Sequence, residues 1–190
     1  MTKADARRTA RSRLDALNAA ERAASSAVIA DAVWQLPEVA AARTLLLYAS
    51  LPDEVDSDEI AREAWRRGII VTYPRCLPVT RELALHHLRD LSELRDAGSY
   101  GIREPDLACP LLQIADIDAV LVPGLGWDRA GNRLGRCAGY YDRLFADPAW
   151  RGFRCGLFFA AQEFPHLPRD DWDGKLDAVA TEKEVLRVEG

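Results

Sequence analysis

The chain has 190 residues, of which 48% are hydrophobic and 29% are charged, and its formal net charge at pH 7 is −5. This composition is typical of a globular protein with a substantial core and excludes a disordered or fibrous chain. The acidic net charge argues against general affinity for nucleic acid or anionic membranes, so any anion-binding site must be local.

The cysteines and histidines do not form a metal-binding motif. The four cysteines are far apart and include no C-x-x-C pair, and the three histidines lack the spacing of zinc ligands. No apolar run reaches the roughly 18 residues that a membrane span needs, and no hydrophobic signal core is present. We therefore expect free thiols, a cytoplasmic protein, and neither nucleic acid nor a membrane as a partner.

Two helices are predicted at the start of the chain. The first covers residues 3–17. Asn18, followed three residues later by Glu21, forms a capping box that begins the second helix, and this helix runs to about Gln35 before Pro37 ends it.

Next come a strand, a helix and a second strand. Residues 44–50 are a short continuous apolar run, which predicts a buried strand. Asp56 is interpreted as the N-cap of the helix that follows, and Gly68 lies where a left-handed C-terminal cap belongs. Residues 69–74 then predict another buried strand.

The rest of the chain is also predicted to form mainly strands, together with a further helix. Glu82–Leu88 predicts a half-exposed strand, residues 117–124 and 155–160 predict buried strands, Tyr140–Ala146 predicts a helix, and residues 177–181 predict a last short strand. Strands that alternate with helices indicate an α/β fold, with a mostly parallel sheet covered by helices on both faces. Ligands of such sheets bind beyond the carboxyl ends of the strands, and the loop after residues 117–124 lies at one of them.

Two familiar nucleotide loops can be excluded there. Residues 126–133 have the glycine spacing of a P-loop, but Asn132 and Arg133 replace its lysine and its Ser or Thr. Residues 124–126 read Gly-Leu-Gly, but the third glycine of a dinucleotide-binding fingerprint is missing.

The segment that follows has the chemistry of a phosphate-binding loop. Arg133 and Arg136 carry planar cationic groups that match phosphate oxygens, and Gly135 and Gly139 allow backbone N–H groups to approach closely. Asp142 would be an oxygen ligand for Mg²⁺. An equally open interpretation is a glycine-rich turn with solvated arginines, in which Asp142 belongs to the first turn of a helix.

Two other charged features are ambiguous by themselves. Lys3, Arg7 and Arg11 share one stripe of the first helix, which either folds over phosphates or is a solvated face. Glu54 follows a buried strand and has no evident structural role, so it either accepts hydrogen bonds from a heterocycle such as a pterin or is a surface acid.

Taken in order along the chain, these residues and several others resemble one family, the 5-formyltetrahydrofolate cyclo-ligases. The resemblance covers nearly the whole chain, and residues 122–142 are its most specific part. The matching residues are Lys3, Arg7, EVDS (54–57), YPR (73–75), YGIREP (100–105), VPG (122–124), WD (127–128), Gly131, RLG (133–135), GYYD (139–142), Asp173 and LD (176–177).

The resemblance implies one domain, residues 1–190, with a three-layer Rossmann-like α/β fold similar to the sugar-phosphate isomerase and CoA-transferase group. It implies an enzyme that converts 5-formyltetrahydrofolate to 5,10-methenyltetrahydrofolate and releases ADP and phosphate. In this reaction ATP phosphorylates the formyl oxygen, N10 attacks the activated carbon, and phosphate leaves. We expect a monomer that uses ATP as a substrate together with Mg²⁺.

The resemblance also implies roles for individual residues. Those expected to bind ATP are Lys3, Arg7, Arg133, Leu134, Gly135, Arg136, Cys137, Ala138, Gly139, Tyr140 and Tyr141. Those expected to bind the folate are Glu54, Trp127, Arg136, Gly139 and Tyr140. Asp142 and Asp173 would hold Mg²⁺, and Arg133 and Tyr140 would act in catalysis.

The loop departs from the family pattern at two positions. Cys137 replaces a glycine, which costs about 1 kcal/mol if the backbone there is left-handed. Ala138 stands where the family often has lysine. The alternative to an active cyclo-ligase is therefore a divergent or non-catalytic relative that binds a folate or another metabolite and uses ATP poorly.

Overall fold

A computed structural model of the chain describes residues 1–96, 101–136 and 139–189. Its largest sheet has eight strands, of which β2, β1, β7, β10 and β12 are mutually parallel, while β3, β6 and β13 are antiparallel to their neighbours. The strand order is β13 (Val185–Arg187), β12 (Ala178–Ala180), β10 (Phe153–Leu157), β7 (Ala119–Val122), β1 (Thr44–Leu46), β2 (Ile70–Leu77), β3 (Glu82–Leu88) and β6 (Leu111–Leu112).

The central strands are buried on both faces, as their continuous apolar sequences predict. Leu45 of β1 is fully buried in the larger of two hydrophobic clusters, and its neighbour Leu46 is fully buried in the other. The same alternation occurs in β7, where Leu121 belongs to the larger cluster and Val120 to the smaller one. The sheet therefore separates two cores.

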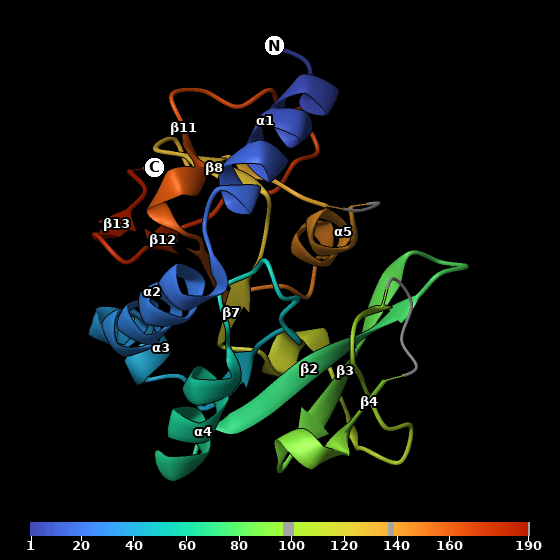
Figure 1. Cartoon of the computed structure of the whole chain (residues 1–190). Coiled ribbons are helices and arrows are strands. Elements are labelled where there is room, and N and C mark those ends of the chain that lie inside the picture. Colours follow the sequence, from blue (N-terminus) through green and yellow to red (C-terminus); the bar gives the residue numbers. More distant parts are fainter. Residues whose placement is uncertain (97–100, 137–138, 190) are drawn as a thin grey trace.

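Helices cover the two faces unequally. Figure 1 shows α2, α3 and α4 on one side of the sheet and α5 on the other. The predicted α/β fold with a mostly parallel sheet is thus confirmed, but the second face is covered by only one short α-helix among the described residues, together with buried Trp127, Trp150 and Phe158. The helices are α1 (Lys3–Asp15), α2 (Ala19–Ala32), α3 (Pro37–Ala40), α4 (Asp58–Arg66) and α5 (Tyr140–Ala146).

The predicted caps of α2 and α4 can be compared with the structure. The capping box of α2 is confirmed, since Asn18 Oδ1 accepts from Glu21 N at 3.0 Å and Glu21 Oε2 accepts from Asn18 N at 2.8 Å. Gly68 follows α4 in the left-handed conformation (φ +76°), as predicted. The interpretation of Asp56 as N-cap was wrong, because Ser57 occupies the N-cap position. Asp56 lies one residue before the N-cap, and its Oδ1 accepts a hydrogen bond from Asp58 N.

Short strands that the sequence did not predict complete the fold. They form a small sheet of β11 (Glu163–Phe164), β8 (Gly126–Asp128) and β9 (Arg133–Leu134), and a pair of β4 (Leu94–Arg95) and β5 (Glu104–Pro105). β12 was also expected to be the last strand, but β13 follows it and pairs antiparallel with it.

The hairpin of β8 and β9 is held by buried Asp128. Its Oδ1 accepts from Ala130 N and Asn132 N, and its Oδ2 accepts from Leu167 N at 2.9 Å. These bonds fix the strand that carries Arg133.

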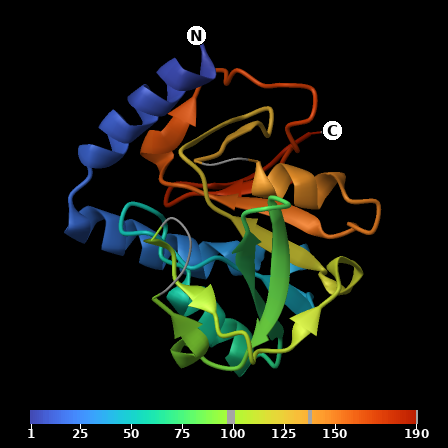
Figure 2. The same ribbon diagram turned by 90° about the vertical axis from the view of Figure 1, so that its right-hand side faces the viewer.

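The N-terminal helix closes the molecule over this hairpin. In Figure 2, α1 lies beside the segment that contains β11. Arg13 of α1 donates to Glu163 O at 2.6 Å, and its guanidinium lies 4.3 Å from the centre of the Phe164 ring. These contacts hold the C-terminal part of α1 against β11. No helix in the described ranges combines the length and apolar character required to cross a bilayer.

Candidate active site

The site has two adjoining pockets, and the second of them includes residues that follow the carboxyl ends of β1 and β7. We call the first the basic pocket. Its volume is about 510 Å³, and it is lined by Lys3, Arg7, Arg133, Leu134, Gly135, Gly139, Asp142, Arg143, Ala146, Asp170, Trp172 and Asp173. These residues come from α1, β9, α5 and the turn at residues 170–173, which are far apart in the sequence.

We call the second the aromatic pocket. Its volume is about 310 Å³, and three tyrosines contribute to its wall. The pocket is lined by Arg11, Tyr48, Ala49, Leu51, Glu54, Pro74, Cys76, Leu83, Ile102, Glu104, Pro123, Gly124, Arg133, Gly135, Arg136, Gly139, Tyr140, Tyr141 and Asp142. Flat apolar walls with a few carboxylates suit a heterocycle that donates hydrogen bonds.

The two pockets share one wall. It consists of Arg133, Gly135, Gly139 and Asp142, each of which lines both pockets. Ligands in the two pockets would therefore meet at a cationic group and two glycines.

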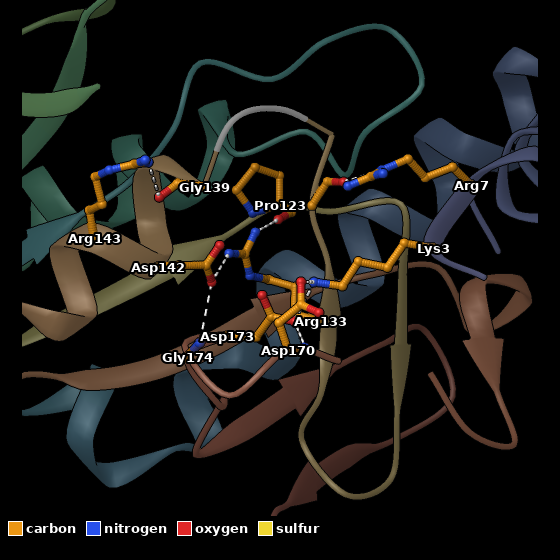
Figure 3. Close-up of polar contacts among 11 residues, drawn as sticks. Lys3, Arg7, Pro123, Arg133, Gly139, Asp142, Arg143, Asp170, Asp173 and Gly174 are labelled. Carbon is orange, nitrogen blue, oxygen red and sulfur yellow. Dashed lines mark hydrogen bonds and ion pairs between the residues drawn. The ribbon is translucent and has the colours of Figure 1, made fainter. Parts of the chain in front are cut away.

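Arg133 is the central cation of this wall. Its side chain is only 5% exposed, and Nη2 donates to Asp142 Oδ1 at 3.1 Å. Nη1 donates to Pro123 O at 3.4 Å, and the guanidinium lies 5.4 Å from the centre of the Tyr141 ring. Figure 3 shows the guanidinium between the carboxylate and the carbonyl. These contacts fix its orientation, and burial strengthens its field.

Lys3 enters the basic pocket from α1. Its ammonium donates to Asp170 Oδ2 at 2.7 Å and to Asp173 Oδ2 at 2.6 Å (Figure 3). Burial by itself lowers the pKa of Lys3, but the hydrogen bonds and negative charges of the two aspartates outweigh it, so the pKa is raised. Lys3 therefore stays cationic and is held in place by two carboxylates.

The other residues of the predicted N-terminal stripe divide between the pockets. Arg7 lines the basic pocket, and its Nε donates to Gly135 O at 3.2 Å. Arg11 lines the aromatic pocket instead. The stripe on α1 thus borders both cavities, with Lys3 and Arg7 half-buried and Arg11 exposed.

Gly139 shapes the shared wall at the start of α5. Its backbone is left-handed, with φ +76°. A Cβ atom there would lie 3.4 Å from Arg143 Nη1 and 3.5 Å from Asp142 Oδ2. A side chain at this position would therefore be strained by the backbone angle and would contact two residues that line the basic pocket.

Glu54 lies in the aromatic pocket and is paired with Arg136. Its Oε1 is 2.8 Å from Arg136 Nε, and its Oε2 accepts from Leu51 N at 3.0 Å. Burial raises the pKa of Glu54, although the charge of Arg136 acts in the opposite direction. The expectation that Glu54 has no structural role was wrong, since it fixes the turn after β1 and pairs with the loop before α5.

The two predicted metal ligands lie on the wall of the basic pocket. Asp142 Oδ1 accepts from Arg133 and from Gly174 N at 3.3 Å, which brings the residue after Asp173 next to Asp142. Within the described ranges, no group of three or more His, Cys, Asp or Glu side chains is arranged to hold a metal. Two carboxylates still fit Mg²⁺, because this ion takes one or two carboxylates and completes its shell with phosphate oxygens and water.

The remaining predicted residues have mixed outcomes. Tyr140 and Tyr141 line the aromatic pocket, and Leu134 lines the basic pocket although it is almost fully buried. Trp127 was expected beside the folate, but it is 1% exposed, packs against Phe158 and lines neither pocket. Cys137 and Ala138 lie outside the described residues.

Several residues of the site were not found from the sequence. Among them are Asp53, whose Oδ2 is 2.8 Å from Arg136 Nη2, and the lining residues Tyr48, Glu104, Asp170 and Trp172. Asp170 and Trp172 belong to the acidic run DDWD around Asp173, so the run itself was a signal for both.

The comparisons with known proteins agree with this fold. Residues 1–182 match the model of the 5-formyltetrahydrofolate cyclo-ligase family. The chain is 30% identical to 5-formyltetrahydrofolate cyclo-ligase of Mus musculus, covering 90% of this chain and 88% of that protein, and 33% identical to the protein of that name from Saccharomyces cerevisiae, covering 83% and 84%. A solved structure of 5,10-methenyltetrahydrofolate synthetase from Aquifex aeolicus has a TM-score of 0.85 at 30% identity, covering 100% of this chain and 94% of that one. The chain therefore belongs to the 5-formyltetrahydrofolate cyclo-ligase family of enzymes.

Proposed function

We propose that this enzyme converts 5-formyltetrahydrofolate and ATP to 5,10-methenyltetrahydrofolate, ADP and phosphate. One observation carries the proposal beyond family membership. The basic pocket and the aromatic pocket share a wall that includes Arg133, Gly135 and Gly139. Transfer of a phosphoryl group between two substrates needs their reacting atoms side by side, and this wall is where ligands of the two pockets would meet.

In this proposal the triphosphate lies in the basic pocket. Lys3, Arg7 and Arg133 supply positive charge, and Gly135 and Gly139 leave room for the phosphates beside the backbone. Lys3 would exchange its bonds to Asp170 and Asp173 for bonds to phosphate oxygens. Phosphoryl transfer depends mainly on position and charge, which suits a wall of fixed cations.

The folate lies in the aromatic pocket. Tyr48, Tyr140 and Tyr141 offer flat surfaces to the pterin, and the Glu54 carboxylate accepts from its N–H groups. The formyl oxygen then attacks the terminal phosphorus at the shared wall, and ADP leaves. N10 attacks the formyl carbon and loses its proton, and the carbon–oxygen bond breaks as phosphate departs. Arg133 stabilises the charge of the transferring group.

Asp142 and Asp173 are the residues that would hold Mg²⁺. The ion would neutralise phosphate charge during transfer. Asp142→Asn should raise the Mg²⁺ concentration that gives half-maximal rate, because asparagine keeps the hydrogen bond to Arg133 but lacks the charge. An unchanged Mg²⁺ dependence would remove Asp142 from the metal site.

The proposal also includes a cytoplasmic, monomeric enzyme. The thiols of Cys109 and Cys155 are buried and not in disulfides, which fits a reducing compartment.

The deciding experiment is an assay of the purified full-length protein. Incubation with 5-formyltetrahydrofolate, ATP and Mg²⁺ should produce the absorbance of 5,10-methenyltetrahydrofolate, with one ADP and one phosphate released for each product. Omission of ATP should abolish the signal. If both substrates bind but neither product nor ADP forms, the proposal is wrong, and the alternative of a non-catalytic folate-binding relative is supported.

A further inference from the structure

Trp172 is an exposed aromatic side chain at the rim of the basic pocket. It is 72% exposed, and among the large hydrophobic residues that the described ranges expose it is the sole aromatic one. Single exposed aliphatic residues are common on protein surfaces, but an indole forgoes a large gain in burial when it stays in water. Its position beside a pocket of cations and carboxylates indicates a surface available to a flat ligand.

The turn that carries Trp172 is fixed on both sides. Asp173 N donates to Asp170 O at 3.1 Å, and Asp170 N donates to Asp173 Oδ2 at 2.8 Å. Lys3 links both carboxylates to α1, as Figure 3 shows. The backbone beneath the indole is therefore held in place before any ligand arrives.

The shared wall between the two pockets gives a direction for the nucleotide. The reacting phosphate belongs at the shared wall, next to Arg133 and Gly139. The rest of the nucleotide must then extend into the part of the basic pocket that the aromatic pocket does not share, which is lined by Lys3, Arg7 and the turn at residues 170–173. Among the residues that line the basic pocket, Trp172 is the aromatic one, and it therefore offers the base a flat surface there.

We propose that Trp172 is the stacking platform for the nucleobase of ATP. This inference rests on the proposed function, because it assigns the far end of the same nucleotide. Stacking of a base on an aromatic side chain is typically worth about tenfold or more in affinity when the side chain is replaced by alanine. It requires a π surface but no hydrogen bond to the base.

The test compares ATP with inorganic tripolyphosphate, which has no base. Their dissociation constants are measured by titration calorimetry, in the presence of Mg²⁺, for wild type, Trp172→Ala, Trp172→Phe and Lys3→Ala. The matched control is Leu107→Ala, because Leu107 is 74% exposed and lines neither pocket.

Trp172→Ala should weaken ATP binding about tenfold and leave tripolyphosphate binding unchanged, and Trp172→Phe should restore most of the loss. Lys3→Ala should weaken both ligands, and Leu107→Ala neither. An effect of Trp172→Ala below twofold on ATP, or an equal effect on both ligands, overturns the stacking role while the proposed function stands. Absence of ATP binding to the wild type would overturn both.

Discussion

Arg136 Nε lies 2.8 Å from Glu54 Oε1, so the loop before α5 is joined across the aromatic pocket to the turn after β1. The Glu54 side chain is 5% exposed, and Arg136 also lies 2.8 Å from Asp53 through Nη2. A single guanidinium thus faces two carboxylates, of which Glu54 lines the pocket proposed for the folate. Burial and the ion pair with Arg136 act in opposite directions on the pKa of Glu54, and the resulting pKa determines how this residue changes protein stability with pH.

Glu54 should make the protein less stable as the pH rises. Burial raises the pKa of Glu54 above the ordinary value of 4.5, so between the two pKa values the native state binds more protons than the unfolded chain. Raising the pH through this window therefore favours unfolding. Urea denaturation of wild type and Glu54→Gln at pH 4 to 7 should show the wild type losing stability relative to the variant.

Glu38 provides a control, because its contribution to stability should change with pH in the opposite direction to that of Glu54. A hydrogen bond from Arg187 lowers the pKa of Glu38, so its contribution to stability is present above the ordinary pKa and is lost as the pH falls. Wild type should therefore gain stability relative to Glu38→Gln as the pH rises. If the difference between wild type and Glu54→Gln stayed constant over this range, burial of Glu54 would not dominate its titration.

Gly68 and Gly139 allow the effect of backbone strain on stability to be distinguished from an effect on ATP binding. Gly68 and Gly139 both have φ +76°, but a Cβ at Gly68 would meet no atom within 4 Å, whereas one at Gly139 would contact Arg143 and Asp142. Alanine should cost about 1 kcal/mol of unfolding free energy at either position. We expect only Gly139→Ala to raise the KM for ATP, by severalfold.

Urea unfolding and steady-state kinetics of both variants test this prediction. Equal kinetic effects at the two positions would mean that backbone strain alone changes activity. Wild-type kinetics in Gly139→Ala would mean that the shared wall tolerates a side chain there.

Removal of the charge of Asp170 and removal of the charge of Asp173 should change ATP affinity in opposite directions. Both accept from Lys3, but only Asp173 is a proposed ligand of Mg²⁺. Phosphates must compete with Asp170 for the same ammonium, so Asp170→Asn should tighten ATP binding, by at most about fivefold for a partly exposed pair. Asp173→Asn should weaken ATP binding in Mg²⁺. Calorimetric titration of each variant with ATP shows whether the affinity rises or falls. Weaker ATP binding to Asp170→Asn would show that Asp170 itself helps to bind the nucleotide.

Local patterns predicted much of this fold because their physics is local. The Asn18 capping box, the left-handed Gly68 and the buried run of β7 each depend on residues close together in the sequence. Strands β8, β9 and β11 have two or three residues each, and their pairing depends on partners elsewhere in the chain, so no periodicity could reveal them.

The candidate site was predicted unevenly for the same reason. The loop residues Arg133 to Asp142 carry recognisable chemistry in one segment. The pairing of Glu54 with Arg136 is a contact between distant segments, and it left Glu54 without an apparent role in the sequence. Trp127 was expected beside the folate because of the family resemblance, but in β8 it is buried in the core against Phe158.

Arg133 should not be replaceable by lysine, although the charge is kept. Its fork donates to Asp142 and to Pro123 O at once, and a single ammonium group cannot reproduce this planar geometry. We expect Arg133→Lys to lower kcat by at least about tenfold, equivalent to about 1.4 kcal/mol of lost transition-state stabilisation.

Arg154→Lys is the matched control, because Arg154 forms a similar fork with Asp177, at 3.0 and 3.1 Å, at the amino end of β10 and away from both pockets. Both variants should unfold at lower urea concentrations than wild type, but Arg154→Lys should keep its kcat. Equal kcat in the two variants would mean that Arg133 only supports the fold, since the control loses the same kind of fork without touching the shared wall.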